Sequence, residues 1–297
     1  MPSFELLFQF VLAGLILGIL YALMGIGITF IYSIMKLINW AMGEFYMIGS
    51  FVMYVIVAFV VGNTYWYIGL PIAISVVFVL GVIVQRILIK PMFDRSVERK
   101  TEYATIITIT LALFLRSLAA ALSGPYQRTP GHYMDKVYIG PLAVSGDRVV
   151  AGLGALLIML IFYLVLRYTW VGMALRAAAD NRTGIQTSGI NLQWLDQVAF
   201  GMGVALAAAA GALLAPVFLV FPNNGAITTM KGFEIIIIGG LGSIPGALIA
   251  GLSLGLVESL GAVFIDPRFQ HVYGFIFLLL VLIFRPTGLF GEKERVA

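Results

Sequence analysis

The sequence has no cysteine, only two histidines and few charged residues. Without cysteine the chain can form neither a disulfide nor a thiolate metal site. His132 and His271 are both expected at outer loops, which argues against a zinc site or a histidine-based triad inside the membrane. The P-loop motif G-x-x-x-x-G-K-[ST] does not occur, so the chain is not expected to hydrolyse ATP itself, and the zinc motif H-E-x-x-H is absent too. We therefore predict no metal, no cofactor and no catalytic residue.

Charge is scarce because apolar residues dominate the composition. Hydrophobic residues make up 61% of the 297 positions and charged residues 11%, whereas a soluble domain carries about 25% charged residues. The net charge is +4, but the basic residues are spread over short polar stretches rather than gathered on one face, so nucleic acid is not an expected partner. The composition predicts a membrane protein whose surface contacts lipid.

Eight stretches are apolar enough to cross a membrane, for which a helix needs roughly 20 residues. The first basic residue is Lys36, so the N-terminal stretch lacks the basic region of a cleavable signal and is expected to remain as a span. We predict an all-α polytopic membrane protein with a single transmembrane domain over residues 1–297. The candidate spans are Leu6–Ser33, Ala41–Val61, Ile68–Ile89, Ala104–Leu122, Val149–Tyr168, Val198–Val220, Phe233–Gly261 and His271–Phe284.

Lysine and arginine in the short loops set the expected orientation, because positive charges favour the cytoplasmic side. Lys36 and the stretches 85–103, 167–182 and 285–297 hold twelve of the eighteen basic residues and are expected in the cytoplasm. The stretches 123–148 and 265–273 hold both histidines and few basic residues, and are expected outside. The N-terminus then lies outside and the C-terminus in the cytoplasm.

This orientation requires an odd number of crossings, whereas eight segments give an even number. The additional crossing is expected within Phe233–Gly261, because a glycine-rich break at residues 239–246 interrupts that segment. We therefore predict about eight to nine crossings, with a short piece near residues 233–241 and a full span from about Ala247. Two interpretations of the break stay open, a broken helix that lines a wet cavity inside the protein and a tight cytoplasmic turn between two ordinary helices.

A weak internal echo accompanies the break. Met35–Gly49 and Met230–Gly240 both begin with Met-Lys and continue with an acidic residue and glycine. Transporters often contain inverted repeats with broken helices at matching places. Two short matches indicate such a repeat without establishing it.

Four segments together resemble the permease subunits of branched-chain amino acid ABC importers, the LivH-type family. Gly14–Phe51 is similar to the family's first helix, which ends in an N-F-A-H-G-E-like turn, and Gly172–Asn191 is similar to its G-x-A-x-R-A-x-A segment. Gly239–Leu260 is close to the family's sequence almost residue for residue. The fourth similar segment is Arg285–Gly291, "RPTGLFG". The resemblance covers essentially the whole chain in the right order.

The resemblance implies a multi-pass permease subunit of an ABC importer in a bacterial-type cytoplasmic (inner) membrane. It implies a small solute, above all a branched-chain or other hydrophobic amino acid, moved by alternating access that ATPase partners drive. An importer of urea or short amides would look nearly the same. The implied partners are a second homologous permease in a heterodimer, two ATP-binding subunits and an extracytoplasmic solute-binding protein.

The segment of residues 169–197, between the fifth and sixth spans, is the predicted coupling segment. Its small helix-forming residues predict one or two short helices, with Gly184 and Gly189 as stops or turns. We expect the small residues to dock in a groove of an ATPase, and the charged residues to form bonds at the rim. The alternative is a loop that only sets topology. The candidate coupling residues are Gly172, Ala174, Leu175, Arg176, Ala178, Asp180, Asn181, Arg182 and Gly189.

Polar residues within or beside the spans are candidates for the translocation path. At the N-F-A-H-G-E position this chain reads Asn-Trp-Ala-Met-Gly-Glu, without the histidine, and Arg116 stands where related chains tend to show an amide. Glu44 either lines the path or caps a helix start. Glu234 either pairs with Lys231 or marks an opening of the path, and Glu258 is expected near the outer surface. The candidate path residues are Asn39, Glu44, Arg116, Glu234, Gly239, Gly240, Gly242 and Ser243.

The extracytoplasmic loop of about residues 123–148 is either a dock for a solute-binding protein or a plain connection. Two rival functions remain. An ion- or proton-coupled secondary transporter would use Glu44, Glu234 and Glu258. An intramembrane enzyme would need a nucleophile and base, and the sequence offers no such set.

Overall fold

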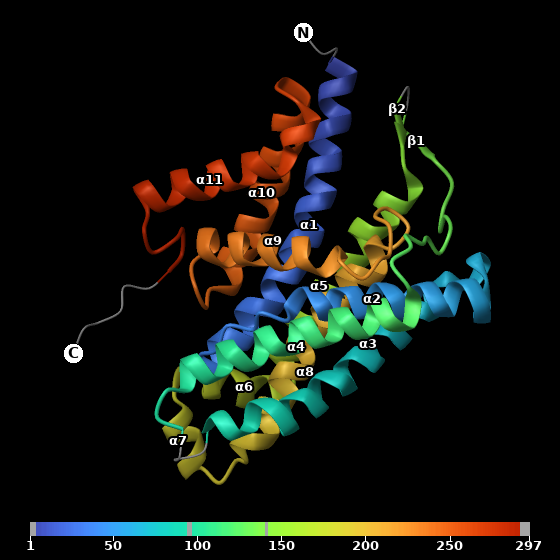
Figure 1. Ribbon diagram of the computed structural model, residues 1–297. Helices are drawn as coiled ribbons and strands as arrows, with labels where there is room; N and C mark the ends of the chain where they lie inside the picture. The colour runs from blue at the N-terminus through green and yellow to red at the C-terminus, as the bar shows by residue number, and fades with distance from the viewer. Residues whose placement is uncertain (1–3, 94–96, 140–141, 292–297) are drawn as a thin grey trace.

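The computed structural model describes residues 4–93, 97–139 and 142–291 and is almost entirely helical (Figure 1). The predicted all-α fold is confirmed. A short antiparallel hairpin of β1 (Val137–Ile139) and β2 (Leu142–Val144) interrupts it. The helices are α1 (Phe4–Met35), α2 (Met42–Ile56), α3 (Trp66–Val84), α4 (Lys100–Ser123), α5 (Gly146–Tyr168), α6 (Trp170–Asp180), α7 (Arg182–Thr187), α8 (Leu192–Leu214), α9 (Asn224–Gly239), α10 (Ile244–Phe264) and α11 (Gln270–Phe284).

Eight helices of the described chain are long and apolar enough to cross a membrane. α2 is extended by a π-helical turn at Val57–Val61, and α3 by further helical turns to Phe93. Each of the eight coincides with a predicted segment. α8 ends at Leu214 rather than near Val220, because Pro216 follows within two residues and lacks the backbone N–H that would continue the helix.

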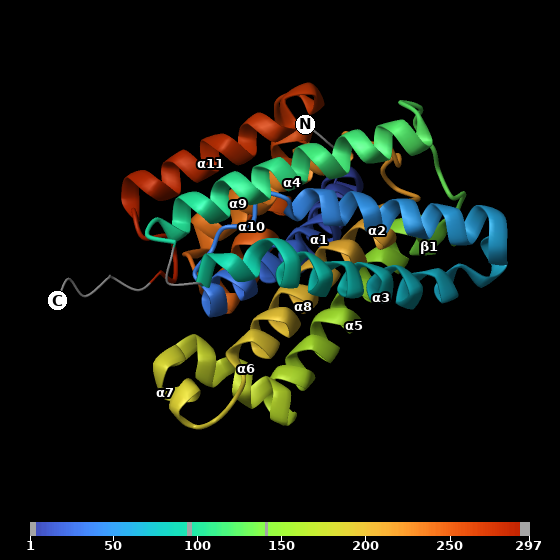
Figure 2. The ribbon, with the colours of Figure 1, turned by 60° about the horizontal axis from the view of Figure 1, so that its bottom comes forward.

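The first four and the last four helices follow the same plan. α1 and α8 are each followed by a non-helical segment, a helix that begins well inside the bundle, and two further helices. α1 packs mainly on α10, whereas α8 packs mainly on α2 and α3, so each leading helix lies among the helices of the other half. Figures 1 and 2 show α1 and α8 in the middle of the bundle. The two halves thus share an order of helices, but the echo itself pairs the junction of α1 and α2 with the second half of α9, which do not correspond in this order.

The connecting segments gather at two opposite ends of the bundle. At one end, the basic end, Arg182 donates to the Ile34 carbonyl oxygen (2.7 Å) and Ser33 to that of Gly242 (2.9 Å). At the other, the loop end, the ring of Tyr133 stacks on that of Trp66 with centroids 4.8 Å apart. The described stretches predicted to be cytoplasmic all fall at the basic end, as the predicted orientation requires; Arg95, Lys293 and Arg295 lie outside the described residues.

The predicted break is present as a four-residue turn at the basic end. α9 ends at Gly239 and α10 begins at Ile244. Gly240 and Gly242 have φ values of 96° and 88°, which only glycine adopts without strain. The prediction of a short helix near residues 233–241 was wrong about its start, since α9 begins at Asn224 and is 16 residues long. Its polar first half, with two threonines and Lys231, resembles a loop in sequence.

The C-terminal tail covers this turn. The backbone N–H groups of Leu289 and Phe290 donate to the carbonyl oxygens of Ile238 (2.8 Å) and Gly239 (3.0 Å). These are carbonyls that the last turn of a helix leaves without partners. The "RPTGLFG" segment is thus part of the fold at the basic end.

Candidate functional site

Glu44 and Arg116 form an ion pair deep in the bundle. The Glu44 carboxylate accepts two hydrogen bonds from the Arg116 guanidinium, at 2.5 Å from Nη2 and 3.2 Å from Nε. The Glu44 side chain is 1% exposed and that of Arg116 is 31% exposed. An arginine at membrane depth is costly unless it is paired, and Glu44 provides the partner for Arg116. Glu44 lies in the first turn of α2, where a negative charge is favourable, but it makes no hydrogen bond to the start of that helix.

The pair lies where the starts of α2 and α9 touch. The backbone N–H of Gly43 donates to Thr229 Oγ1 (3.0 Å), and a Cβ on Gly43 would collide with the carbonyl oxygen of Gly225. Asn39 is buried and accepts from the backbone N–H of Ala41 (3.0 Å). Asn39 thus shapes the turn before α2, and glycine at both contact positions lets the two helix starts approach closely.

A second buried group of charges joins α1, α9, α10 and α11. Lys231 Nζ lies 2.9 Å from Glu234 Oε2 and 2.5 Å from Glu258 Oε1. The Tyr21 hydroxyl donates to Glu258 Oε2 (2.9 Å). We call Lys231, Glu234, Glu258 and Tyr21 the Lys231 cluster. It confirms the Lys231–Glu234 pairing, whereas the expected surface position of Glu258 is wrong, since that residue is fully buried.

Sequence reasoning did not select Lys231 as a site residue, although a lysine inside an apolar run was the available signal. The glycines and the serine of the break lie elsewhere. Gly239 is fourteen residues beyond Gly225 along α9, about 21 Å at the helical rise. The turn formed by Gly239, Gly240, Gly242 and Ser243 therefore lies at the basic end under the tail.

The predicted coupling segment forms the two short helices that the sequence led us to expect. Thr169 Oγ1 accepts from the backbone N–H of Gly172 (3.1 Å) and starts α6, and Asn181 Oδ1 accepts from that of Gly184 (2.8 Å) and starts α7. Gly189 has φ 79° and turns the chain toward α8. Gly184, expected as a stop, lies within α7 instead.

The two faces of α6 differ sharply. The small residues expected to dock in a partner are buried against the protein's own spans, since α6 packs on α5, α1 and α8. A Cβ on Gly172 would collide with the α5 backbone. That docking expectation is wrong for the inward residues Gly172, Ala174, Leu175 and Ala178. The outward face carries Trp170, Met173, Arg176 and Asp180, all exposed.

Arg182 fastens this hairpin to the spans. Its guanidinium bonds both Asp196 oxygens at the start of α8 (2.9 and 2.8 Å) and the Ile34 carbonyl oxygen at the end of α1. The guanidinium carbon also lies 4.7 Å from the centre of the Phe93 ring. Three separate chain segments thus meet on one side chain, which is not free for a partner.

The loop of residues 123–148 is tied to the loop end at several points. Arg128 and Val220 exchange backbone hydrogen bonds of 2.9 and 2.8 Å. His132 Nδ1 lies 2.7 Å from Asp147 Oδ2, and this carboxylate raises the pKa of the exposed His132 ring. Tyr126 and Tyr138 are more than 70% exposed. The loop is therefore an anchored structure that presents exposed aromatic side chains.

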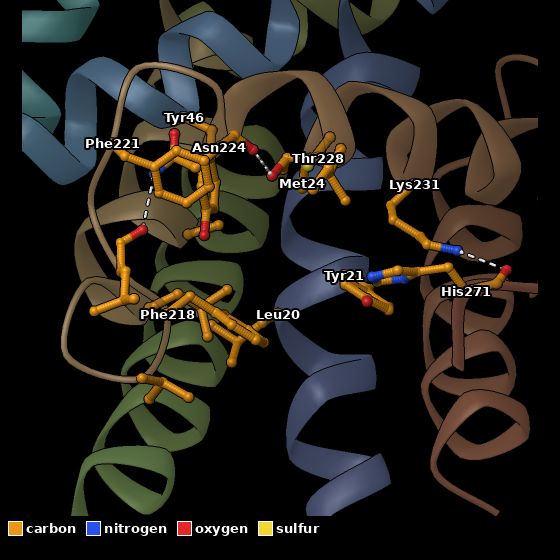
Figure 3. Close-up of a pocket in the computed structure, with 15 residues that line it drawn as sticks. Leu20, Tyr21, Met24, Tyr46, Phe218, Phe221, Asn224, Thr228, Lys231 and His271 are labelled. Carbon is orange, nitrogen blue, oxygen red and sulfur yellow. Dashed lines mark hydrogen bonds between the residues drawn. The ribbon is translucent and has the colours of Figure 1, made fainter. Parts of the chain in front are cut away.

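A cavity of about 390 Å³ lies between α1, the end of α8, α9 and α11 (Figure 3). Its walls are mainly apolar, and Lys231, His271 and Tyr21 stand at one end. Sequence reasoning did not predict it, because the lining comes from segments far apart in the chain. Among the described residues no group of acidic residues and histidines could hold a metal ion.

Comparison with known proteins decides the family. The family described as "Branched-chain amino acid transport system / permease component" matches residues 10–284. The chain belongs to this family. It is 33% identical over 294 residues to the high-affinity branched-chain amino acid transport system permease protein LivH of Escherichia coli (strain K12), covering 95% of this chain and 94% of that protein. The resemblance seen in the sequence is thereby confirmed.

Other relatives agree with this assignment. BraD of Pseudomonas aeruginosa, a permease of the same type of system, is 30% identical over 311 residues, or 99% of both chains. A probable LivH of Methanocaldococcus jannaschii is 30% identical over 287 residues, covering 92% of this chain and 89% of that protein. Among solved structures, PsaBC from Streptococcus pneumoniae in complex with Fab aligns over 96% of this chain and 94% of that chain, with 13% identity and a TM-score of 0.49. This member of the permease family is a multi-pass protein of the inner membrane.

Proposed function

We propose that the protein moves a branched-chain or similar hydrophobic amino acid across the inner membrane by alternating access, driven by ATP-hydrolysing partner subunits. The observation that carries this proposal is the match to amino acid permeases over nearly the whole chain. No P-loop motif occurs in the sequence, so the proposal assigns ATP hydrolysis to partner subunits. The single domain over residues 1–297 then acts as the membrane conduit.

The outward face of α6 is the proposed contact with an ATP-binding subunit. Trp170 and Met173 offer apolar area, and Arg176 and Asp180 offer charge-assisted bonds at its edge. The rings of Trp170 and Trp194 lie 6.1 Å apart and widen this surface onto α8. The buried small residues Gly172, Ala174, Leu175 and Ala178 then seat the helix on the spans, so a push on α6 reaches α1, α5 and α8 together.

Arg182, Asn181 and Gly189 take a supporting part in this proposal. Asn181 and Gly189 shape the ends of α7, and Arg182 locks it to α1 and α8. Because a loosely attached hairpin would absorb a push instead of passing it on, this bracket is the feature expected of a lever.

The surface of α4 around Arg116 is the proposed contact with the second permease and the path between the two subunits. α11 and α4 are the two least buried of the eight spans. A partly exposed guanidinium facing lipid would be costly. The homologous permease of a heterodimer would cover this guanidinium, or the aqueous path between the two subunits would solvate it. Asn39 and Glu234 then support the path from inside, because neither is exposed.

The anchored loop of residues 123–148 is the proposed dock for a solute-binding protein. Its exposed tyrosines are residue types that anchor interfaces. Its ties to α5 and to the segment after α8 would carry a docking force into the bundle.

Reconstitution tests the function. The chain, its partner permease and the ATP-binding subunits are placed in vesicles, and uptake of radiolabelled leucine, isoleucine and valine is followed with the binding protein present. We expect uptake that requires ATP. Urea and acetamide should not inhibit this uptake. Uptake driven by an ion gradient without ATP would contradict the proposal, and uptake of urea alone would correct the solute.

A further inference from the structure

A second cavity adjoins the one in Figure 3 on the side of the loop end, and we call it the outer groove. It has a volume of about 160 Å³, and α1 forms its floor. The ends of α8 and α10 and the starts of α5 and α11 stand around it. Nine of its twelve lining residues are apolar, so most of the groove offers a surface that suits a hydrocarbon chain.

The mouth of the outer groove, at the starts of α5 and α11, is polar. Arg148 is exposed in the first turn of α5, and Gln270 is the first residue of α11. Among the described residues that line the groove, Arg148 is the one charged side chain. The neighbouring Asp147 does not line it, because its buried carboxylate accepts from the backbone N–H of Tyr133 in the loop (2.7 Å). The mouth therefore complements an anion, and a guanidinium is well suited to phosphate.

The polar mouth and the apolar depth of the groove match the position of a phospholipid in the outer leaflet. From Phe10 to Leu20 the lining follows α1 for ten residues, which is about 15 Å at the helical rise. One leaflet is half of a hydrocarbon core about 30 Å thick. The mouth lies at the loop end, which the predicted orientation places outside. A head group at Arg148 would thus lie at the outer surface, and its acyl chain would lie within the leaflet.

The outer groove and the larger cavity share a wall. Leu20, Leu214, Val217 and Phe218 line both spaces, so the two adjoin. The larger cavity, of about 390 Å³, is also mainly apolar. Apolar space of this kind offers water few hydrogen-bond partners. The end of a long acyl chain that enters by the groove would fill part of it.

We propose that the outer groove binds one anionic phospholipid of the outer leaflet. Its phosphate pairs with Arg148 and accepts a hydrogen bond from the Gln270 amide, and one acyl chain lies along α1 toward Leu20 and Phe218. The bound lipid then bridges α5 and α11 across α1. The site does not depend on the proposed function, because the groove would bind this lipid whatever solute the importer carries.

Photochemical cross-linking tests the site in the complete importer. The vesicles consist of phosphatidylcholine with a trace of phosphatidylglycerol that carries a diazirine near the end of one acyl chain. After illumination, mass spectrometry of the peptides locates the cross-links. We expect them near Leu20 and Phe218, in excess over the outer surface of α5 around the exposed Leu157. Added phosphatidylglycerol should compete for these positions, whereas additional phosphatidylcholine should not.

Two variants at the loop end test the phosphate contact. Arg148→Gln should lower cross-linking in the groove about tenfold, as expected for the loss of a charge-assisted hydrogen bond. Arg268→Gln is the matched control, because Arg268 is exposed just before α11 but does not line the groove. The control should leave cross-linking unchanged. An equal loss in both variants, or no loss in Arg148→Gln, would overturn the site.

Two variants of α1 test the place of the acyl chain. Ala13→Trp, on the floor of the groove, should exclude the chain and reduce cross-linking, whereas Leu15→Trp, on an exposed position of α1 outside the groove, should not. Cross-links that persist in Ala13→Trp, or competition by phosphatidylcholine as strong as that by phosphatidylglycerol, would show general contact with the bilayer and overturn the proposal. Cross-linking of the isolated chain that is lost in the complete importer would assign the groove to the partner permease and overturn it as well.

Discussion

The two buried groups of charges differ in how the protein surrounds them. The Lys231 cluster joins four helices, and the side chains of its lysine and two glutamates are at most 3% exposed. The Glu44–Arg116 pair joins α2 to α4, a helix that packs weakly on the rest of the chain, and its arginine is 31% exposed. Each group includes residues of a short helix, α2 for Glu44 and α9 for Lys231 and Glu234.

The Lys231 cluster is thus enclosed by the chain, whereas the Glu44–Arg116 pair reaches the outer surface of the subunit through Arg116. The cluster is completed within the chain, so its charges position α1, α9, α10 and α11. Both bonds of the pair reach one carboxylate oxygen of Glu44, while the Arg116 guanidinium is partly exposed, which is costly toward lipid and is the reason for the proposed partner subunit or aqueous path there. Of these two groups, only the Glu44–Arg116 pair has a partly exposed ionic side chain.

Removing the ammonium of the cluster should have the largest effect. Lys231→Met leaves Glu234 and Glu258 buried without a cation, which should cost about 3–5 kcal/mol of stability. Thermal unfolding of the purified complex, followed by the fluorescence of this subunit, measures the loss. Glu258→Gln is the matched control, because Lys231 and Glu234 still balance each other; it should unfold near the unaltered protein. Equal losses in both variants would show that charge balance does not govern this cluster.

Removing the arginine of the pair should cost less. Arg116→Met leaves Glu44 buried and unpaired, but part of the guanidinium was already exposed, so we expect a loss of about 2–3 kcal/mol. The double variant Arg116→Met, Glu44→Gln should recover most of it in the same unfolding assay. An effect as large as that of Lys231→Met would contradict the distinction between the two sites.

Much of the fold could be predicted from the sequence, because its signals are local. Apolar length marked the eight spans, the glycines of residues 239–246 marked the break, and the small helix-forming residues of 169–197 marked two short helices. The partners of buried charges could not be predicted, since Glu44 and Arg116 are 72 residues apart. The faces of α6 were misassigned for the same reason: small residues suit an interface with any partner, and only packing shows that the partner is the chain itself.

The Arg182 bracket offers a smaller test at the basic end. Arg182→Lys keeps the charge but cannot make the paired bonds to Asp196 together with the bond to Ile34. Stability should fall by about 1 kcal/mol, while leucine uptake per ATP hydrolysed falls several-fold because the hairpin is less firmly held. Arg167→Lys, at the exposed end of α5, serves as control for the loss of a nearby arginine. Unchanged uptake per ATP in Arg182→Lys would remove the bracket from the coupling account.

The smallest expected effect concerns the loop end. Asp147 raises the pKa of His132 above its usual value near 6.5, so the stabilisation from this contact is complete below that value and is lost as the pH rises through the raised folded-state pKa. Hydrogen exchange of the Tyr133 amide, which donates to the same carboxylate (2.7 Å), should therefore quicken over that interval beyond the ordinary pH effect. His132→Gln should abolish the additional step. A step that persists in the variant would assign the pH dependence to another group.

The central claim is that ATP-hydrolysing partners move this chain through the outward face of α6. The most direct measurement compares ATP-driven leucine uptake and retention of the ATP-binding subunits for the double variant Met173→Glu, Arg176→Glu with those for Gln193→Glu, a control on an exposed residue of α8. We predict that the double variant loses the ATP-binding subunits and uptake together, while the control keeps both. Full uptake with firmly bound ATP-binding subunits in the double variant would contradict the account.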